Sequence, residues 1–365
     1  DVGLVDVFSN PTITAMSALF ESEHHENALK TVRPSIHCFE RYDTDEEVMF
    51  PLSANQEQML ILYNMDPNGA TYNMPSEAKI KSSTSIELLL KSLKIATERH
   101  EVFRSHIVND TETGEFLQST TPMSGFEMPF RIYNGDMSKE DFINEMKYSP
   151  FDLFSGPWFR VGVIEGEGDD ENTLVFSMHH IAGDGWSSNI MLKEINHLCN
   201  VDGVSVVENL PLLDIQYSDF ACWQTDMLVD VSETELAYWR KQLGVHGGPP
   251  ALDLPYDRPR PKNQTFIGKN HLLEITSELV VLLNDVCKRE GVTLYMLLLV
   301  TFQLLLSRYS RQEDVCVGTP FAGRDQAGTE NLVGYFVNTL AMKSSISNKN
   351  SVSTLMKDIK ATVLS

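Results

Sequence analysis

Basic residues are scarce in this sequence, and their scarcity excludes two classes of partner. Of 365 residues, 29 are Lys or Arg and 51 are Asp or Glu, which gives a formal net charge of −22. No segment is a basic tract. A surface this acidic repels phosphate backbones and anionic lipid headgroups. We therefore expect no nucleic-acid partner and no membrane partner, and interpret the acidic residues as a solvated surface.

Cysteine is also sparse, and the pattern lacks any close pair. The five cysteines are widely spaced, and no C-x-x-C occurs among Cys38, Cys199, Cys222, Cys287 and Cys316. Disulfide frameworks and zinc sites use closely spaced cysteines in even sets. We expect buried thiols in a reducing compartment, and hence a cytoplasmic protein.

The sequence has no apolar run long enough to span a bilayer. The longest, residues 294–306, is interrupted by Thr301 and Gln303. A membrane span needs about 20 apolar residues, so this run predicts a buried helix instead.

Strand and helix patterns alternate along the rest of the chain. Ser53 and Gln56 form a capping box, which predicts a helix start. Val315, Val317 and Thr319 alternate as in a strand. The alternation predicts an α/β or α+β fold, and 365 residues suffice for two subdomains.

The most informative segment is MHHIAGDGWS, residues 178–187, which follows the apolar strand pattern of residues 174–176. An imidazole at a strand end can accept a proton from an amine or alcohol, or orient that group. Adjacent strand residues point to opposite faces, so only one of His179 and His180 can face a given cavity. A satisfied core histidine is the alternative interpretation of this pair.

Other residues of this segment have narrower interpretations. His179, His180 and Asp184 are possible metal ligands by type, but opposed strand faces and the lack of a further clustered ligand disfavour a metal site. Asp184 is better placed to brace the loop through an arginine. Gly185 leaves its N–H accessible and could stabilise an oxyanion.

Six ordered motifs, and one further element ahead of the histidine motif, resemble the signatures of one family. The run HHIAGDG (179–185) resembles the active-site signature of condensation domains of non-ribosomal peptide synthetases. The other signatures are resembled, in the same order along the chain, by LSANQ (52–56), RHEVFR (99–104), PFDL (150–153), YSDFACW (217–223), VGTPFAGR (317–324) and GYFVNTL (334–340). The resemblance covers residues 48–365.

This resemblance implies a fold and a reaction. The fold would be two chloramphenicol-acetyltransferase-like subdomains in a V-shaped pseudo-dimer, with a tunnel between them and the histidine motif at its midpoint. Upstream and downstream carrier domains would insert phosphopantetheine arms from opposite ends, so the chain itself would bind no cofactor. The downstream aminoacyl amine would attack the upstream acyl thioester and form an amide.

The resemblance also implies residue roles. His180 would deprotonate or position the amine, and His179 would be structural. Asp184 would pair with Arg324 as a buried brace, and Gly185 would approach the thioester carbonyl. The supporting residues implied by the other signatures are Arg104, Trp223 and Asn338.

The implied domain organisation extends beyond one domain. Residues 1–24 resemble the closing segment of a phosphopantetheine carrier domain, and residues 25–47 are interpreted as a linker. Residues 48–260 would form the N-terminal half of the condensation domain and residues 261–365 its second half. Relatives continue well past the sixth signature, so we expect that half to be incomplete at its C-terminus and to expose apolar surface. An adenylation domain is the expected neighbour.

Two alternatives stay open. A docking module would hold carriers without chemistry, and a related acyltransferase would form esters; the Asp-Phe-Gly-Trp-Gly run of plant-type ester-forming relatives is absent. The intact histidine pair and Gly185-Trp186-Ser187 disfavour cyclising and epimerising subtypes. Residues 70–75 favour a donor that is L-configured or achiral, whereas the upstream module, peptide or polyketide, is left open.

Overall fold

The fold falls into two compact units in a computed structural model. The structure describes residues 34–39, 48–81, 84–166, 171–200, 210–244, 248, 251–259, 261–262, 268–269, 271–347 and 349–364. The motif unit comprises Ser35–Ser232 and Phe321–Asn338, and the C-terminal unit takes in Glu233–Pro320 and Thr339–Ser365. The predicted carrier segment, residues 1–24, lies outside the described residues, as does most of the predicted linker.

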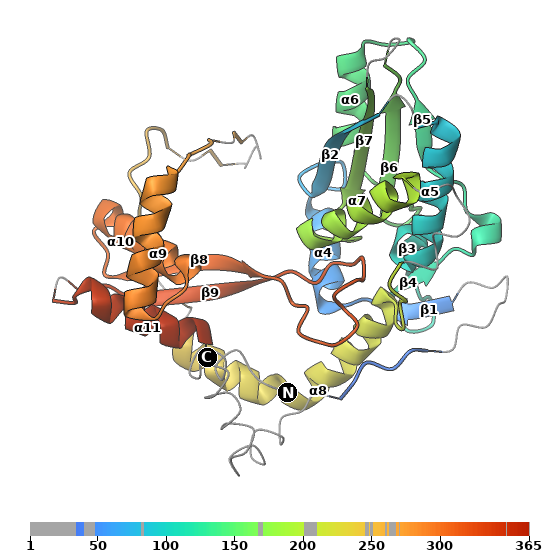
Figure 1. The fold of residues 1–365 in the computed structure, drawn as a ribbon. Helices are drawn as coiled ribbons and strands as arrows, with labels where there is room; N and C mark the ends of the chain where they lie inside the picture. The colour runs from blue at the N-terminus through green and yellow to red at the C-terminus, as the bar shows by residue number, and fades with distance from the viewer. Residues whose placement is uncertain are drawn as a thin grey trace, which may run out of the picture. The chain divides into compact units, whose positions relative to one another are not determined.

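The motif unit is built on a four-stranded sheet with the strand order β2-β7-β6-β5 (Figure 1). A smaller antiparallel sheet has the order β1-β4-β3. The strands are β1 Val48–Pro51, β2 Asn73–Ile80, β3 Ser105–Asn109, β4 Phe116–Thr120, β5 Phe130–Ile132, β6 Phe159–Ile164 and β7 Asn172–His179. The helices are α4 Ala54–Met65, α5 Ile86–Arg99, η2 Glu101–Arg104, η3 Met123–Gly125, α6 Lys139–Tyr148, α7 Gly185–Asn200 and α8 Tyr217–Leu243, of which α8 continues into the other unit.

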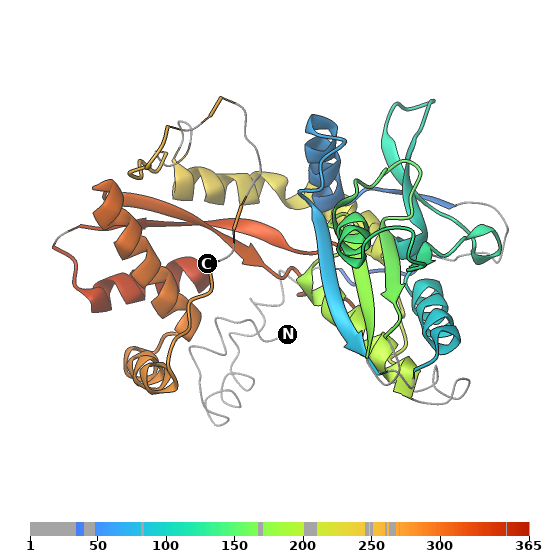
Figure 2. The same ribbon diagram turned by 90° about the horizontal axis from the view of Figure 1, so that it is seen from above.

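Strand β7 is covered on both faces, which explains its unbroken apolar run. Leu174, Phe176 and Met178 pack in the same core cluster as residues of α5 and α7, whereas Val175 packs with residues of α6. Figure 2 shows β2 in blue beside the green strands of the same sheet. The alternation of faces along β7 sets the opposite directions of the two histidines at its end.

Local signals in the sequence define several helix starts. The predicted capping box is confirmed: Gln56 N donates to Ser53 Oγ at 3.1 Å, and Ser53 N donates to Gln56 Oε1 at 3.0 Å. Each bond satisfies an N–H that the first helical turn leaves unpaired.

The segment Phe321–Asn338 folds into the core of the motif unit. Leu332, Val333 and Phe336 are buried in the cluster that contains β7. Asn55 Nδ2 on α4 donates to the carbonyls of Tyr335 at 3.2 Å and Val337 at 2.9 Å. These contacts place one late signature, residues 334–340, beside the first.

The C-terminal unit pairs two strands with three helices and the end of α8. Its further elements are α9 Ser277–Glu290, α10 Leu294–Ser310, β8 Asp314–Phe321, β9 Asn338–Ser345 and α11 Val352–Leu364. Gln303 on α10 is buried, donates to Met342 O at 2.9 Å and accepts from Ser344 Oγ at 2.8 Å. A fully satisfied polar side chain thus fixes α10 against β9.

The prediction that residues 294–306 form a buried helix is only half right. One face of α10 is buried, but a stripe of large apolar side chains along its other face is 41–63% exposed, namely Tyr295, Leu298, Phe302, Leu305 and Tyr309. The burial of an apolar helix depends on what packs against it, and the described residues cover this face only in part.

No single described helix is long and apolar enough to cross a bilayer. Helices α9 and α10 meet at a bend of 100° and satisfy those criteria only when they are counted together.

Close packing at Gly334 gives a prediction about stability. A Cβ on Gly334 would lie 2.0 Å from Tyr217 Cδ2, so Gly334→Ala forces the buried tyrosine or the backbone to shift. We expect the free energy of unfolding to fall by about 1–3 kcal/mol, measured by urea denaturation. Gly125→Ala is the control, because the nearest atom to its Cβ would be Thr121 Cγ2 at 3.9 Å. Equal unfolding midpoints for the two variants would contradict this packing.

Candidate active site

The histidine pair is held by the ends of three neighbouring strands. His179 N donates to Trp158 O at 2.8 Å, just before β6, and His180 N donates to Tyr72 O at 2.8 Å, just before β2. The backbone of the pair therefore has fixed partners on both sides, and the two side chains diverge from it.

His179 is an internal residue. It is 4% exposed, its Nδ1 accepts a hydrogen bond from Ile181 N at 3.2 Å, and its ring lies near those of Tyr72 and Phe151. Burial, followed by the neighbouring His180, lowers the pKa of His179 to about 4. The imidazole of His179 is thus enclosed, and one of its nitrogens is bonded to the backbone of the loop.

His180 is less enclosed, and its ring meets Tyr335. The two ring centroids are 4.7 Å apart at an interplanar angle of 63°, an edge contact. Burial lowers the pKa of His180, so the imidazole is neutral near pH 7. Its Nδ1 is buried without a hydrogen-bond partner of good geometry, and the nearby backbone of His180 and Gly183 partly opposes the lowering of the pKa, whereas Nε2 is not fully buried. Nε2 is therefore the ring nitrogen available to a ligand.

Asp184, at the start of α7, is completely buried. Its Oδ1 accepts from Ser187 N at 2.8 Å and from Arg324 Nη2 at 3.2 Å. Its Oδ2 accepts from Phe336 N at 3.2 Å. The carboxylate thus fastens the first turn of α7 to residues of the Phe321–Asn338 segment.

The expected pairing of Asp184 with Arg324 is present in the motif unit. The second guanidinium nitrogen, Nη1, donates to Thr329 O at 2.6 Å and Leu332 O at 2.7 Å. The guanidinium also lies over the ring of Phe336, 4.1 Å from its centroid. Burial lowers the pKa of Arg324, and the Asp184 carboxylate acts in the opposite direction. Arg324 therefore holds its own loop together through two backbone carbonyls and also pairs with Asp184.

Gly323 makes this closure possible. Its φ is +65°, and a Cβ there would lie 2.2 Å from Phe336 O. A side chain would be strained by the backbone and would push Phe336 away from Asp184.

Several hydroxyl groups of the site were missed by the sequence reasoning. Ser187 Oγ lies 2.8 Å from both Asp184 Oδ1 and Gly334 O and donates to one of them. Tyr217 Oη lies 2.7 Å from Ser53 Oγ and donates to Tyr335 O at 2.6 Å. All of these residues belong to the quoted motifs, but the motifs do not show which atoms meet.

The remaining predicted residues occupy different places. Gly185 begins α7, and a Cβ there would meet no atom within 4 Å, so the space beside it is open. Arg104 is buried and donates to Thr121 O at 2.6 Å, which ties η2 to the end of β4. Trp223 packs on Phe220 of α8, with ring centroids 5.7 Å apart. Asn338 is exposed at the start of β9.

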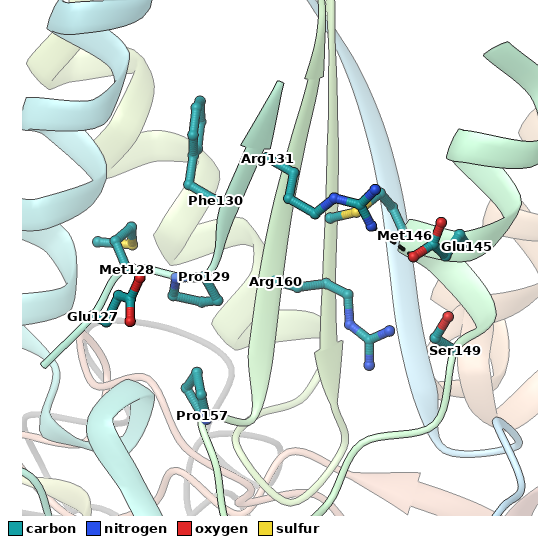
Figure 3. A pocket seen from close by; sticks show the side chains of 10 residues that line it. All are labelled: Glu127, Met128, Pro129, Phe130, Arg131, Glu145, Met146, Ser149, Pro157 and Arg160. Atoms are coloured by element: carbon teal, nitrogen blue, oxygen red, sulfur yellow. Dashed lines mark hydrogen bonds and ion pairs between the residues drawn. The ribbon is translucent and has the colours of Figure 1, made fainter. Parts of the chain in front are cut away.

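Two hollows of the motif unit are lined by none of the predicted site residues. One, of about 880 Å³, is lined by residues of α7 including Trp186 and Lys193, and by Glu330. The other, of about 470 Å³, lies at the β5 edge and contains Arg131 and Arg160, whose guanidinium groups point to the same side (Figure 3).

The arginines of the second hollow have structural partners. Arg131 Nη1 pairs with Glu145 Oε1 at 2.6 Å. Arg160 donates to Pro150 O at 2.9 Å and lies 3.7 Å from the ring centroid of Phe151. Among the described residues, no group of three or more His, Cys, Asp or Glu side chains is arranged to hold a metal ion.

Comparison with known proteins defines the family. The family model "Condensation domain" matches residues 46–365. One of the linear gramicidin synthase proteins of Brevibacillus parabrevis is 36% identical over 323 residues, which cover 86% of this chain and 6% of that protein. The chain belongs to the condensation-domain family, and it spans a small part of the length of the curated relative that it matches.

Solved structures show the same fold at lower identity. A four-domain nonribosomal peptide synthetase bound to AMP and glycine has a TM-score of 0.73 at 20% identity, covering 88% of this chain and 24% of that one. The X-domain in complex with OxyB from teicoplanin biosynthesis has a TM-score of 0.75 at 18% identity. The match covers 91% of this chain and 72% of that chain. The described mixed α/β architecture is thus the condensation-domain fold.

The buried ion pair gives a second prediction. Asp184→Asn leaves the Arg324 guanidinium, whose side chain is 2% exposed, without a counter-charge. We expect a loss of about 3–5 kcal/mol in the free energy of unfolding, measured by urea denaturation. The control is Glu145→Gln, which breaks an ion pair that is 46% and 41% exposed and should cost less than about 1 kcal/mol. Normal stability together with lost activity would instead assign Asp184 a direct chemical role.

Proposed function

We propose that this chain forms an amide between two carrier-bound substrates. An upstream acyl or peptidyl thioester is the donor, and a downstream aminoacyl amine is the acceptor. The observation that carries the proposal is the neutral imidazole of His180, with Nε2 available, beside an intact Asp184–Arg324 ion pair. Membership of the condensation-domain family supports it.

The proposed reaction follows from this geometry. Nε2 of His180 accepts a proton from the attacking amine, whose nitrogen forms a C–N bond to the thioester carbonyl carbon. The C–S bond breaks, and the proton passes from the imidazolium to the departing thiolate. Open space beside Gly185 leaves room for the thioester. Holding both tethered substrates together supplies much of the rate.

The partners belong to the same proposal. Carrier domains would deliver both substrates on phosphopantetheine arms, and an adenylation domain would load the acceptor. The relatives support this arrangement, since the chain spans only 6% of the linear gramicidin synthase protein that it matches.

A docking module without chemistry is the second candidate. The likeness to the teicoplanin X-domain in complex with OxyB favours it, because a fold of this kind occurs there in a protein complex. Fold alone does not separate the two functions. The accessible nitrogen of His180 favours catalysis, because a purely structural histidine has no need of it.

The test is direct. In the full-length protein that contains this chain, we load an acyl group on the upstream carrier and an amino acid on the downstream one. Mass spectrometry should detect the condensed product on the downstream carrier. His180→Ala should lower the rate of its formation by about 100-fold or more, because the proton acceptor is lost.

The control and the contrary outcome separate the candidates. Glu145→Gln, in the exposed ion pair at α6, should leave the rate unchanged. No product from the wild type would leave the docking module as the function. Equal rates for wild type and His180→Ala would remove the imidazole from the reaction.

The pKa of His180 predicts the pH dependence. Burial lowers that pKa below its usual 6.5, and the neutral imidazole is the proton acceptor. The acceptor amine has its own pKa of about 8 and reacts only when neutral, so each rate is divided by the neutral fraction of the amine. The corrected rate of amide formation should then persist as the pH falls to 6.5 and decline only as it falls further, through the pKa of His180 in the folded protein. Single-turnover rates between pH 5 and pH 8, an interval of about 3 units around the histidine pKa, would measure this. An acid limb above 6.5 in the corrected rate would contradict the role of burial.

A further inference from the structure

Tyr335 carries a hydroxyl group that the fold does not use. Its side chain is 8% exposed, and its ring packs against His180. The hydroxyl has no hydrogen-bond partner among the described residues, yet it is not fully enclosed. A phenylalanine would fill this position equally well, so the presence of an unpaired hydroxyl at a nearly buried position needs another explanation.

Hydrogen bonds with three other segments hold the backbone around Tyr335, although this residue lies in a loop. Its carbonyl accepts from Tyr217 Oη at 2.6 Å and from Asn55 Nδ2 at 3.2 Å. The next residue, Phe336, donates its N–H to Asp184 at 3.2 Å. The side chain is therefore presented to His180 from a fixed point, as a group that contacts reacting atoms must be.

We propose that the Tyr335 hydroxyl donates a hydrogen bond to the carbonyl oxygen of the acyl thioester, beside the imidazole of His180. This inference rests on the proposed amide-forming function and adds a second group that contacts the reacting atoms. The bond strengthens as negative charge develops on that oxygen during attack by the amine. His180 then receives the proton, and Tyr335 stabilises the oxyanion.

The protonation state agrees with a donor role. Burial raises the pKa of Tyr335, and Tyr72 and Asp184 act in the same direction. The phenol therefore keeps its proton throughout the range in which His180 titrates, and it serves as a donor and not as a base.

The test compares matched Tyr→Phe variants of the full-length protein. Tyr335→Phe keeps the ring that packs on His180 and removes only the hydroxyl. With both carriers loaded, we expect the single-turnover rate of amide formation to fall about 10- to 100-fold. The thermal midpoint and the acid limb of the pH profile should stay unchanged, because no internal hydrogen bond is lost and His180 remains equally buried.

Tyr133→Phe is the matched control, since its hydroxyl donates to Met137 O at 2.8 Å beside α6, on the other side of the sheet. Its rate of amide formation should equal that of the wild type. A Tyr335→Phe rate within twofold of the wild type would overturn the inference, as would a fall accompanied by a shifted acid limb or a lowered thermal midpoint. A wild type without product would contradict the proposed function itself, which distinguishes the two failures.

Discussion

The site depends on one buried ion pair between residues 140 positions apart in the sequence, Asp184 and Arg324. Each partner has further hydrogen bonds: the carboxylate accepts from backbone and hydroxyl donors, and the guanidinium donates to two carbonyls of its own loop. Such a pair offsets the cost of burying two charges only when these additional bonds are made. The pair therefore acts as the fastening of a loop, and that loop brings Tyr335 to His180.

The two adjacent histidines are buried to different extents because successive side chains of a strand point to opposite faces. His179 is enclosed, with its Nδ1 occupied by a backbone N–H, whereas His180 retains one available nitrogen. Desolvation lowers the pKa of both. The same physical effect thus acts on one enclosed imidazole and on one that keeps an exposed nitrogen, and it holds the second in the neutral form that the proposed amide formation requires.

Local features were predictable from the sequence, and features that depend on distant packing were not. The capping box at Ser53 and the divergence of the histidine pair follow from short-range geometry. The pairing with Arg324 came from family resemblance. The bond from Tyr217 to Tyr335 O and the exposed face of α10 depend on which segments meet in three dimensions, which no periodicity reveals.

The return of Phe321–Asn338 to the motif unit has a consequence for recombining synthetases. Strands β8 and β9 belong mainly to the C-terminal unit, yet the chain between them completes the core around Tyr217 and Leu332. A chimera with a single junction near residue 260 would take Phe321–Asn338 from the second parent together with β8 and β9. A chimera that keeps the core of the motif unit intact needs two additional junctions, one on each side of Phe321–Asn338. The motif unit then retains this segment from its own parent sequence.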